Sequence, residues 1–203
     1  MDFQTVVRRR RMVRDYDPNR PVPPQLVERI MENAIRAPSA GFSQGWGFLL
    51  LDQRRDVERF WASASPEQHV KHGWLAGMTR APLIVAPHSN KDAYLDRYAQ
   101  PDKGWTDRDE SRWPAPYWDI DVGFASLLML LTAVDAELGA CFFGIMPDRI
   151  ASFKREFGVP DSYHPIGAVT IGYPMPDKKS PSLRRGRRSV TEVVHRGQWS
   201  ASG

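Results

Sequence analysis

The sequence predicts one domain of mixed α and β structure, and two observations support this. The 203 residues suit a single domain, and a 41% share of hydrophobic residues is enough for a packed core. Short apolar runs typical of buried strands also alternate along the chain with segments whose apolar residues recur at helical spacing. We expect residues 1–203 to form this domain, with an insertion or lid at about 88–118.

The helical segments are recognised by apolar stripes and by their end signals. Asp2 suits the N-cap of the first helix, and Gly139 suits the C′ position after the fourth. The fourth helix is apolar on nearly all sides, which places it in the middle of a fold or across a subunit interface. The predicted helices cover residues 3–14, 24 to about 35, 53–62, 121–138 and 147–157 with a cap at Gly158.

Four short apolar runs predict strands, and one polar stretch interrupts them. The runs are GFLLLD at 47–52, PLIVAP at 82–87, ACFFG at 140–144 and IGAVTIG at 166–172. The stretch 88–118 is polar and rich in Trp, Asp and Pro, which predicts an insertion or lid rather than part of the core. The tail after Tyr173 is basic and rich in turn residues.

The cysteine content and the hydropathy of the sequence indicate in which cellular compartment the protein works and whether it inserts in a membrane. The one cysteine, Cys141, lies in an apolar run, so the sequence offers neither a disulfide framework nor a Cys-based zinc cluster. The longest apolar run, Val122 to Val134, is short for a bilayer span and is flanked by Asp121 and Asp135. We expect a soluble cytoplasmic protein that does not insert in a membrane.

The stretch GFSQG at 41–45 matches the G-x-S-x-G pattern of a nucleophile elbow. Such an elbow needs a strand before the serine and a helix after it, whereas the predicted order here is the reverse. Nothing positions His164 or His195 to complete a triad with Ser43. A hydrolase is therefore disfavoured.

Other site motifs are missing or weak. The chain contains no G-x-G-x-x-G, Walker A or H-E-x-x-H pattern. His69 and His72 are three residues apart without a nearby third ligand, so we expect no metal. Asp119 and Asp121 would not face each other on a helix, and we interpret them as capping its start.

Two arginine clusters lie near opposite ends of the chain, although the net charge is only +4. On the predicted first helix, Arg10 and Arg14 share a face, and such close like charges favour a bound anion. A tail that folds back would bring both clusters to one phosphate. A solvated basic face or a nucleic-acid patch remains open. The clusters are Arg8, Arg9, Arg10, Arg11 and Arg14, and Arg184, Arg185, Arg187 and Arg188.

Four stretches, in this order, resemble motifs of the FMN-dependent nitroreductase superfamily. They are RRMVRDY at 10–16, APSAGFSQGW at 37–46, DVGFASLLMLLTAVDAELGACFFG at 121–144, and IGYP at 171–174 with RRSVTEVVH at 187–195. The resemblance implies an α+β, nitroreductase-like fold with a central, mostly antiparallel sheet flanked by helices. It also implies an intertwined homodimer with paired central helices and FMN at the interface.

The resemblance also assigns the binding residues. Arg10, Arg14 and the C-terminal arginines, Arg187 foremost, would hold the phosphate, and the loop from Pro38 would approach the flavin from the partner subunit. Phe42 and Trp105 are expected at the substrate, and no side chain is expected to be catalytic because FMN carries the chemistry. The cofactor-binding residues would be Arg10, Arg11, Met12, Arg14, Pro38, Ser39, Ala40, Phe42, Gln44, Phe142, Phe143, Gly144, Arg185, Arg187 and Arg188.

The implied activity is ping-pong hydride transfer from NADH or NADPH to a nitroaromatic, a quinone or a related metabolite. Met12, Phe42 and Gly45 depart from the serine, asparagine and proline that are common in the family, which affects the acceptor more than the cofactor. A specialised member that uses flavin or deazaflavin on one metabolite stays open, as does a basic nucleic-acid-binding module. If the protein is a flavin-dependent oxidoreductase, as we expect, it should not bind nucleic acid.

The aromatic residues of the insertion admit two interpretations. Trp105, Trp113, Tyr117 and Trp118 could form a lid over the acceptor. They could equally pin down a long surface insertion by packing on one another.

Overall fold

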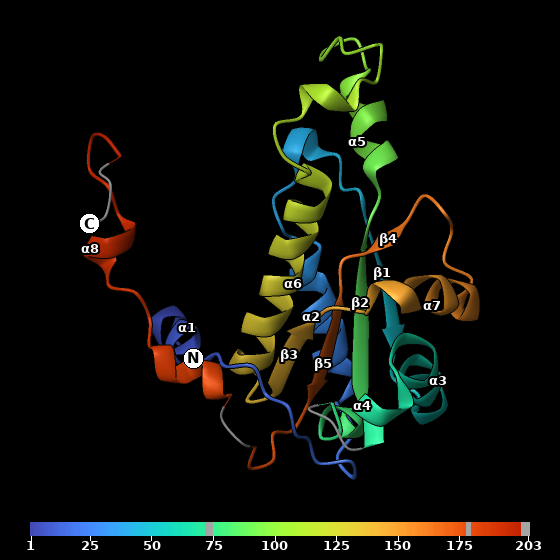
Figure 1. Ribbon diagram of the computed structural model, residues 1–203, viewed down its shortest axis with the longest axis vertical. Helices are drawn as coiled ribbons and strands as arrows, with labels where there is room; N and C mark the ends of the chain where they lie inside the picture. The colour runs from blue at the N-terminus through green and yellow to red at the C-terminus, as the bar shows by residue number, and fades with distance from the viewer. Residues whose placement is uncertain (72–74, 178–179, 200–203) are drawn as a thin grey trace.

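A computed structural model describes residues 1–71, 75–177 and 180–199 (Figure 1). Its centre is a five-stranded sheet in the order β1-β2-β5-β3, with β4 beside β2, and the paired strands are antiparallel. This confirms the predicted mostly antiparallel sheet. The strands are β1 Trp46–Leu51, β2 Leu83–Ser89, β3 Gly139–Phe143, β4 His164–Pro165 and β5 Ala168–Gly172.

Helices cover both faces of the sheet. On one face α2 (Pro24–Ala34) packs beside the long helix α6 (Tyr117–Asp135), and on the other α3 (Arg54–Ala64) packs beside α7 (Ile150–Phe157). The other helical elements are α1 Phe3–Arg9, η1 Ala40–Phe42, α4 Glu67–Lys71, η2 Met78–Arg80, α5 Lys91–Tyr98, η3 Glu110–Arg112, η4 Pro147–Arg149, η5 Pro181–Arg185 and α8 Val190–Val193.

The two-residue period of the strands creates two hydrophobic cores. On β2, Val85 faces the core under α2 and α6, while its neighbours Ile84 and Ala86 face the core under α3 and α7. On β3, Ala140 and Cys141 divide in the same way. This burial on both faces explains why the strands read as continuous apolar runs rather than as alternating ones.

Helix α6 is 19 residues long and apolar enough, by length and composition alone, to cross a membrane. From the apolar run 122–134 we expected a segment too short to span a bilayer. The helix is longer than that run because it begins five residues earlier, at Tyr117. More than half of it is buried in this chain, against α2 and the sheet. Its apolarity is thus explained by its central place in the fold.

The first predicted helix is too long, because α1 ends at Arg9 rather than at residue 14. From Arg10 the chain is extended: Met12 forms a parallel bridge with Ala140, and the Val13 N–H donates to the Ala140 carbonyl over 3.0 Å. The segment covers the edge of β3 while burying Val13 and Tyr16, contacts that a continued helix would lose. Tertiary pairing has overridden local helical propensity here.

The predicted C′ role of Gly139 is also wrong. Glu137 adopts the left-handed conformation that closes α6, with φ of 60°, and Gly139 begins β3. Glycine is needed at 139 for another reason, since a Cβ there would lie 2.8 Å from a methyl group of Val13. The close approach of the 10–16 segment to β3 depends on this missing side chain.

His88 on β2 is a buried histidine whose protonation should destabilise the fold. Its ring stacks on Phe153, with centroids 5.8 Å apart, and Nδ1 lies 2.8 Å from the Ala86 carbonyl. Nε2 is buried without a hydrogen-bond partner among the described residues. Burial, together with the nearby Lys154 and His164, lowers the pKa of His88 from 6.5 to about 4.

We therefore predict an acid-dependent loss of stability that His88 causes. The unfolded chain binds the His88 proton below pH 6.5 while the folded protein excludes it, so stability should fall between pH 6.5 and 4, by about 3 kcal/mol at most. Denaturant unfolding across this range should show a shallower pH dependence for His88→Phe, which keeps the stacked ring. Equal slopes in the two proteins would contradict this prediction.

Candidate functional site

The two arginine clusters meet at one cavity of about 860 Å³. The extended 10–16 segment supplies one wall, and the turn η5 of the tail supplies the other. Since Arg10, Met12 and Arg14 are spaced by two residues, an extended chain directs them to one side. The sequence predicted that Arg10 and Arg14 share a face of a helix. They do line the same cavity, but the backbone that carries them is extended rather than helical. The lining residues include Arg10, Arg11, Met12, Arg14, Asp177, Ser182, Arg184 and Arg187.

The cavity carries uncompensated positive charge. Five arginines line it against one aspartate. Only Arg11 is paired with that aspartate, and within residues 1–71, 75–177 and 180–199 the other four guanidinium groups form no ion pair. Arg14 makes one long contact of 3.4 Å to the Met12 carbonyl. Such a cluster favours a bound anion, and a phosphate group fits guanidinium donors well.

Asp177 binds the start of the tail to the 10–16 wall of the cavity, a contact that the sequence did not predict. Its carboxylate accepts a hydrogen bond from the Arg14 N–H over 2.9 Å and pairs with the Arg11 guanidinium. Burial alone would raise the pKa of Asp177, but these two donors outweigh it and hold the pKa below its usual value. Its setting in PMPDKK signals a turn, and no sequence pattern links it to the distant arginines.

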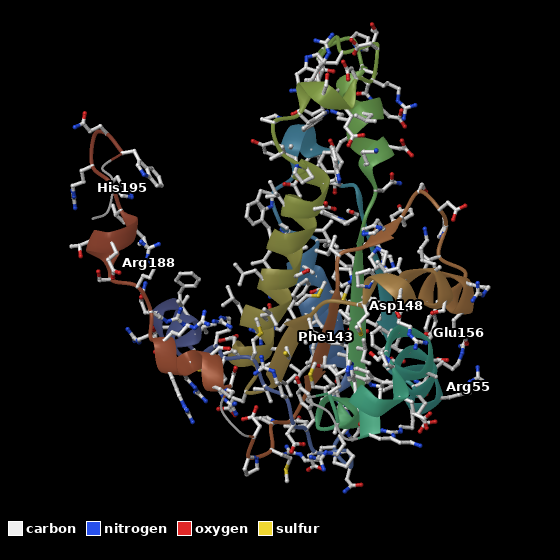
Figure 2. All side chains as sticks on the ribbon, in the orientation of Figure 1. Arg55, Phe143, Asp148, Glu156, Arg188 and His195 are labelled. Carbon is white, nitrogen blue, oxygen red and sulfur yellow. The ribbon has the colours of Figure 1, made fainter. Side chains whose placement is uncertain are left out.

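Two of the predicted arginines lie outside this cavity. Arg188 donates to the Glu192 carbonyl over 2.9 Å, and Figure 2 shows it on the projecting tail, far from Phe143 in the sheet. Arg185 is exposed and does not line the cavity, whereas its neighbour Arg184 does. The short helical turn η5 directs adjacent arginines to different sides, which the linear sequence does not reveal.

The end of β3 lies along the same strand as the cavity wall. Met12 pairs with Ala140, so Phe142 follows two residues, or roughly 7 Å, further along β3. Phe143 turns its ring to the opposite core, where it stacks on Trp61 with centroids 5.5 Å apart. Gly144 is exposed, with open space where a side chain would be. Phe143 thus anchors the strand end, and Gly144 leaves its backbone accessible.

The loop from Pro38 to Gln44 is a strained turn that tertiary contacts stabilise. Gly41, Phe42 and Gln44 all have φ between 49° and 60°. For the two that are not glycine, this conformation costs roughly 1–2 kcal/mol each. The Gln44 N–H donates to Ser39 Oγ over 3.0 Å. Strain of this kind clusters at functional sites, where surrounding structure over-determines it.

Ser43 makes a structural hydrogen bond rather than serving as a nucleophile. Its hydroxyl donates to the Ala40 carbonyl over 2.7 Å. The loop also connects helix α2 to strand β1, the reverse of the order that a nucleophile elbow requires. The structure agrees with the sequence in disfavouring a hydrolase.

The loop and the arginine cavity do not meet within one chain. Figure 1 shows η1 beside the end of α6 nearest α5, whereas α1 and the first part of the tail lie beside the other end. Residues 38–44 and the arginine cavity of the same chain therefore lie beside opposite ends of α6. The predicted contribution of the loop to the cofactor site stays a prediction.

The insertion has its own small aromatic core. Trp113 lies 4.5 Å from the ring centroid of Tyr98 and 5.6 Å from that of Trp105. Trp113 also packs on Tyr94, Tyr117 and Trp118. Trp105 is half-buried in this cluster, with Arg112 over its ring. In one chain these side chains pin down the insertion, and a role over the acceptor remains a prediction.

Two further candidates have structural explanations or fall outside the described residues. Cys141 is buried in the core, and burial raises the pKa of its thiol to about 11, which makes it a poor nucleophile. His69 lies on α4, but its proposed partner His72 lies outside the described residues. Elsewhere in the described chain, no group of three His, Cys, Asp or Glu side chains could hold a metal.

Solved structures of known proteins share this architecture. A nitroreductase family protein from Clostridium difficile superimposes with a TM-score of 0.71 at 21% identity, over 98% of this chain and all of its own. A protein from Exiguobacterium sibiricum, provisionally named a nitroreductase and solved in complex with FMN, gives a TM-score of 0.65 at 20% identity, over 93% of this chain and 98% of its own. The fold is therefore that of the nitroreductase-like proteins.

The family follows from the sequence comparison. The model of the Nitroreductase family matches residues 7–173, and the chain belongs to that family. A relative from Methanothermobacter thermautotrophicus, provisionally named an NADH dehydrogenase/NAD(P)H nitroreductase, is 27% identical over 86% of this chain and 78% of its own. The NADH dehydrogenase of Thermus thermophilus is 25% identical over 86% and 87%. The protein is an oxidoreductase of the nitroreductase type, as the motifs predicted.

Asp177 should contribute measurably to stability, because it links the two ends of the chain. We predict that Asp177→Ala lowers the free energy of unfolding by about 2 kcal/mol, since the Arg14 N–H and Arg11 lose a charged acceptor. Denaturant unfolding measures the change. As a control, Asp161→Ala removes a fully exposed carboxylate 3.7 Å from Lys154 and should have almost no effect. Equal effects of the two substitutions would refute the role of Asp177.

Proposed function

We propose that this protein is an FMN-dependent oxidoreductase that takes a hydride from NADH or NADPH and reduces electron-poor acceptors such as nitroaromatics or quinones. The observation that carries the proposal is the cavity lined by five arginines, four of which form no ion pair with any described residue. Family membership supports it, as does the FMN complex of the Exiguobacterium sibiricum protein.

The cavity fits the phosphate of FMN in charge and in donor chemistry. A phosphomonoester carries up to two negative charges, and the four guanidinium groups without an ion pair in the described chain would offset them with donors to spare. We assign the phosphate to Arg10, Arg14 and Arg187, and we add Arg184 because it lines the same wall. Met12 supplies an apolar contact in place of a hydroxyl.

The chemistry that FMN supplies when bound is acceptance of a hydride and its delivery to a second substrate. The chain itself would bind, orient and exclude water. Phe143, fixed against Trp61, would hold the backbone of Phe142 and Gly144 towards the cofactor, where N–H groups can stabilise developing negative charge. Nicotinamide and acceptor would use the site in turn, so no acid–base side chain is needed.

The site requires a homodimer in this proposal. Helix α6 exposes Ile120, Phe124 and Leu127, which form one stripe at helical spacing. The tail reaches away from the body (Figure 1) and exposes Val190 and Trp199 by 72% and 84%. Two chains would bury these surfaces, and each would bring its loop 38–44, including Phe42, to the FMN held by its partner.

Two alternatives are separated by simple observations. A specialised member acting on one metabolite, with flavin or deazaflavin, is suggested by Phe42, and it would show little turnover of a generic quinone or nitrofuran. A nucleic-acid-binding module would need arginines spread over a surface, whereas here they line a cavity that favours a small anion.

The buried, unreactive thiol of Cys141 is compatible with the cytoplasmic location that we propose.

Removing the phosphate ligands should release the cofactor. We predict that Arg10→Ala combined with Arg14→Ala weakens FMN binding about a hundredfold or more, because each charged hydrogen bond contributes roughly 1.5–3 kcal/mol. The flavin absorbance per protein measures retention. As a matched control, Arg55→Ala with Arg155→Ala removes two exposed arginines from α3 and α7. Full flavin retention in the first variant would contradict the phosphate assignment, and a colourless wild-type protein that binds no FMN would overturn the proposed function.

The dimer should depend on the exposed stripe of α6. We predict that Phe124→Glu with Leu127→Glu converts the protein to a 23.1 kDa monomer that binds FMN poorly, since two buried charges would face their copies across the interface. Sedimentation velocity and flavin absorbance measure the two effects. A wild-type monomer, or a variant that stays dimeric, would contradict the proposed assembly.

A further inference from the structure

Three side chains hold the strained loop in place from outside it. Tyr94 and Arg97 lie on helix α5 of the insertion, and Asp121 lies in the first turns of α6. We call these three residues the loop clamp. None of them belongs to the cofactor site proposed above.

Asp121 is the centre of the clamp. Its Oδ2 accepts the Ala40 N–H over 2.8 Å and the Tyr94 hydroxyl over 2.7 Å. Asp121 is 3% exposed and Tyr94 is fully buried, so water does not compete for these bonds. Burial and the adjacent carboxylate raise the pKa of Tyr94 well above its ordinary value, which keeps the hydroxyl a donor.

Arg97 holds the next residue of the loop, Gly41. Its Nε donates to the Gly41 carbonyl over 2.9 Å, while its two terminal nitrogens bind both oxygens of Asp102 at 2.8 Å. A guanidinium fixed at both ends in this way has little freedom to move. The loop backbone is therefore held at two successive residues.

The loop also touches α5 too closely to move independently. A Cβ at Gly41 would lie 2.6 Å from the ring of Tyr98, and one at Gly45 would lie 2.5 Å from the ring of Tyr94. The Asn90 N–H, at the start of α5, donates to the Gly45 carbonyl over 2.8 Å. The insertion and the loop therefore behave as one body.

One large side chain of the loop is left free. Phe42 is 76% exposed, although its backbone is in the left-handed conformation that bulky residues avoid. The fold thus keeps the Phe42 backbone in an unfavourable conformation, and among the described residues none covers its ring.

We propose that the loop clamp determines acceptor size by fixing the position of Phe42 above the acceptor site. The inference rests on the proposed function, in which the loop faces the FMN of the partner subunit. Tyr94, Arg97 and Asp121 do not touch the acceptor and act as positioning residues through Phe42. The insertion is then a fixed wall rather than a lid that opens.

The first test measures the loop in the flavin-loaded protein without using activity. Tyr94→Phe removes one bond to Asp121 and keeps the ring against Gly45, so amide hydrogen exchange in the peptide 38–45 should accelerate by about tenfold. Tyr98→Phe is the matched control, since it makes the same change one turn along α5 at a hydroxyl without a hydrogen bond to the described residues. Equal exchange in wild type and Tyr94→Phe would overturn the proposal.

The second test compares a small and a bulky acceptor, 1,4-benzoquinone and 2-methyl-1,4-naphthoquinone. Phe42→Ala should raise the bulky-to-small ratio of kcat/KM by about tenfold, mostly through KM, and Tyr94→Phe should raise it less. If Tyr94 acts through Phe42, adding Tyr94→Phe to Phe42→Ala should have no further effect.

The outcomes separate this proposal from the proposed function. Fully additive effects of Tyr94→Phe and Phe42→Ala, or a ratio that neither substitution alters, would overturn the clamp in an enzyme that still binds FMN and reduces quinones. Absence of flavin from the wild-type protein would overturn both proposals, since the loop would then face no acceptor site.

Discussion

The arrangement of the site depends on the contact that Asp177 makes with the 10–16 segment. Its carboxylate accepts the Arg14 N–H and pairs with Arg11, so it holds the tail against the extended chain that follows α1. Asp177 is also the one carboxylate among the described residues that line the cavity, where it offsets part of the charge of five arginines. One half-buried acceptor thus binds the tail to the 10–16 segment, next to the cavity that both basic stretches line.

The same extended segment connects the anion site to the sheet. Met12 and Val13 pair with Ala140 on β3, and the missing side chain of Gly139 allows that approach. Because β3 continues from this point towards Phe142 and Gly144, a rigid strand links the charged end of the site to its exposed backbone end. The packing of the Phe143 ring on Trp61 in the core fixes the position of the end of β3.

The loop 38–44, which we propose forms the other half of the site, is held in place by contacts from outside it rather than by its own local preference. The loop 38–44 is locally unfavourable, with left-handed residues that are not glycine, and it persists because Asp121 and Arg97 bind its backbone. Places where local preference and structure disagree are where function is expected. The aromatic core of the insertion, built on Tyr98 and Trp113, supports the helix that carries this clamp.

The sequence by itself determined the order and type of most elements, because apolar periodicity and end signals such as Pro24 and Gly158 act locally. It also predicted that two arginine clusters share one anion, since such charge must be offset. It could not predict that helix α1 stops at Arg9, that Asp177 binds the 10–16 segment, or that Tyr94 and Asp121 hold Ala40. Those features arise from pairings between residues distant in sequence, where burial and backbone hydrogen bonds override local preference, and only the tertiary structure decides which partners meet.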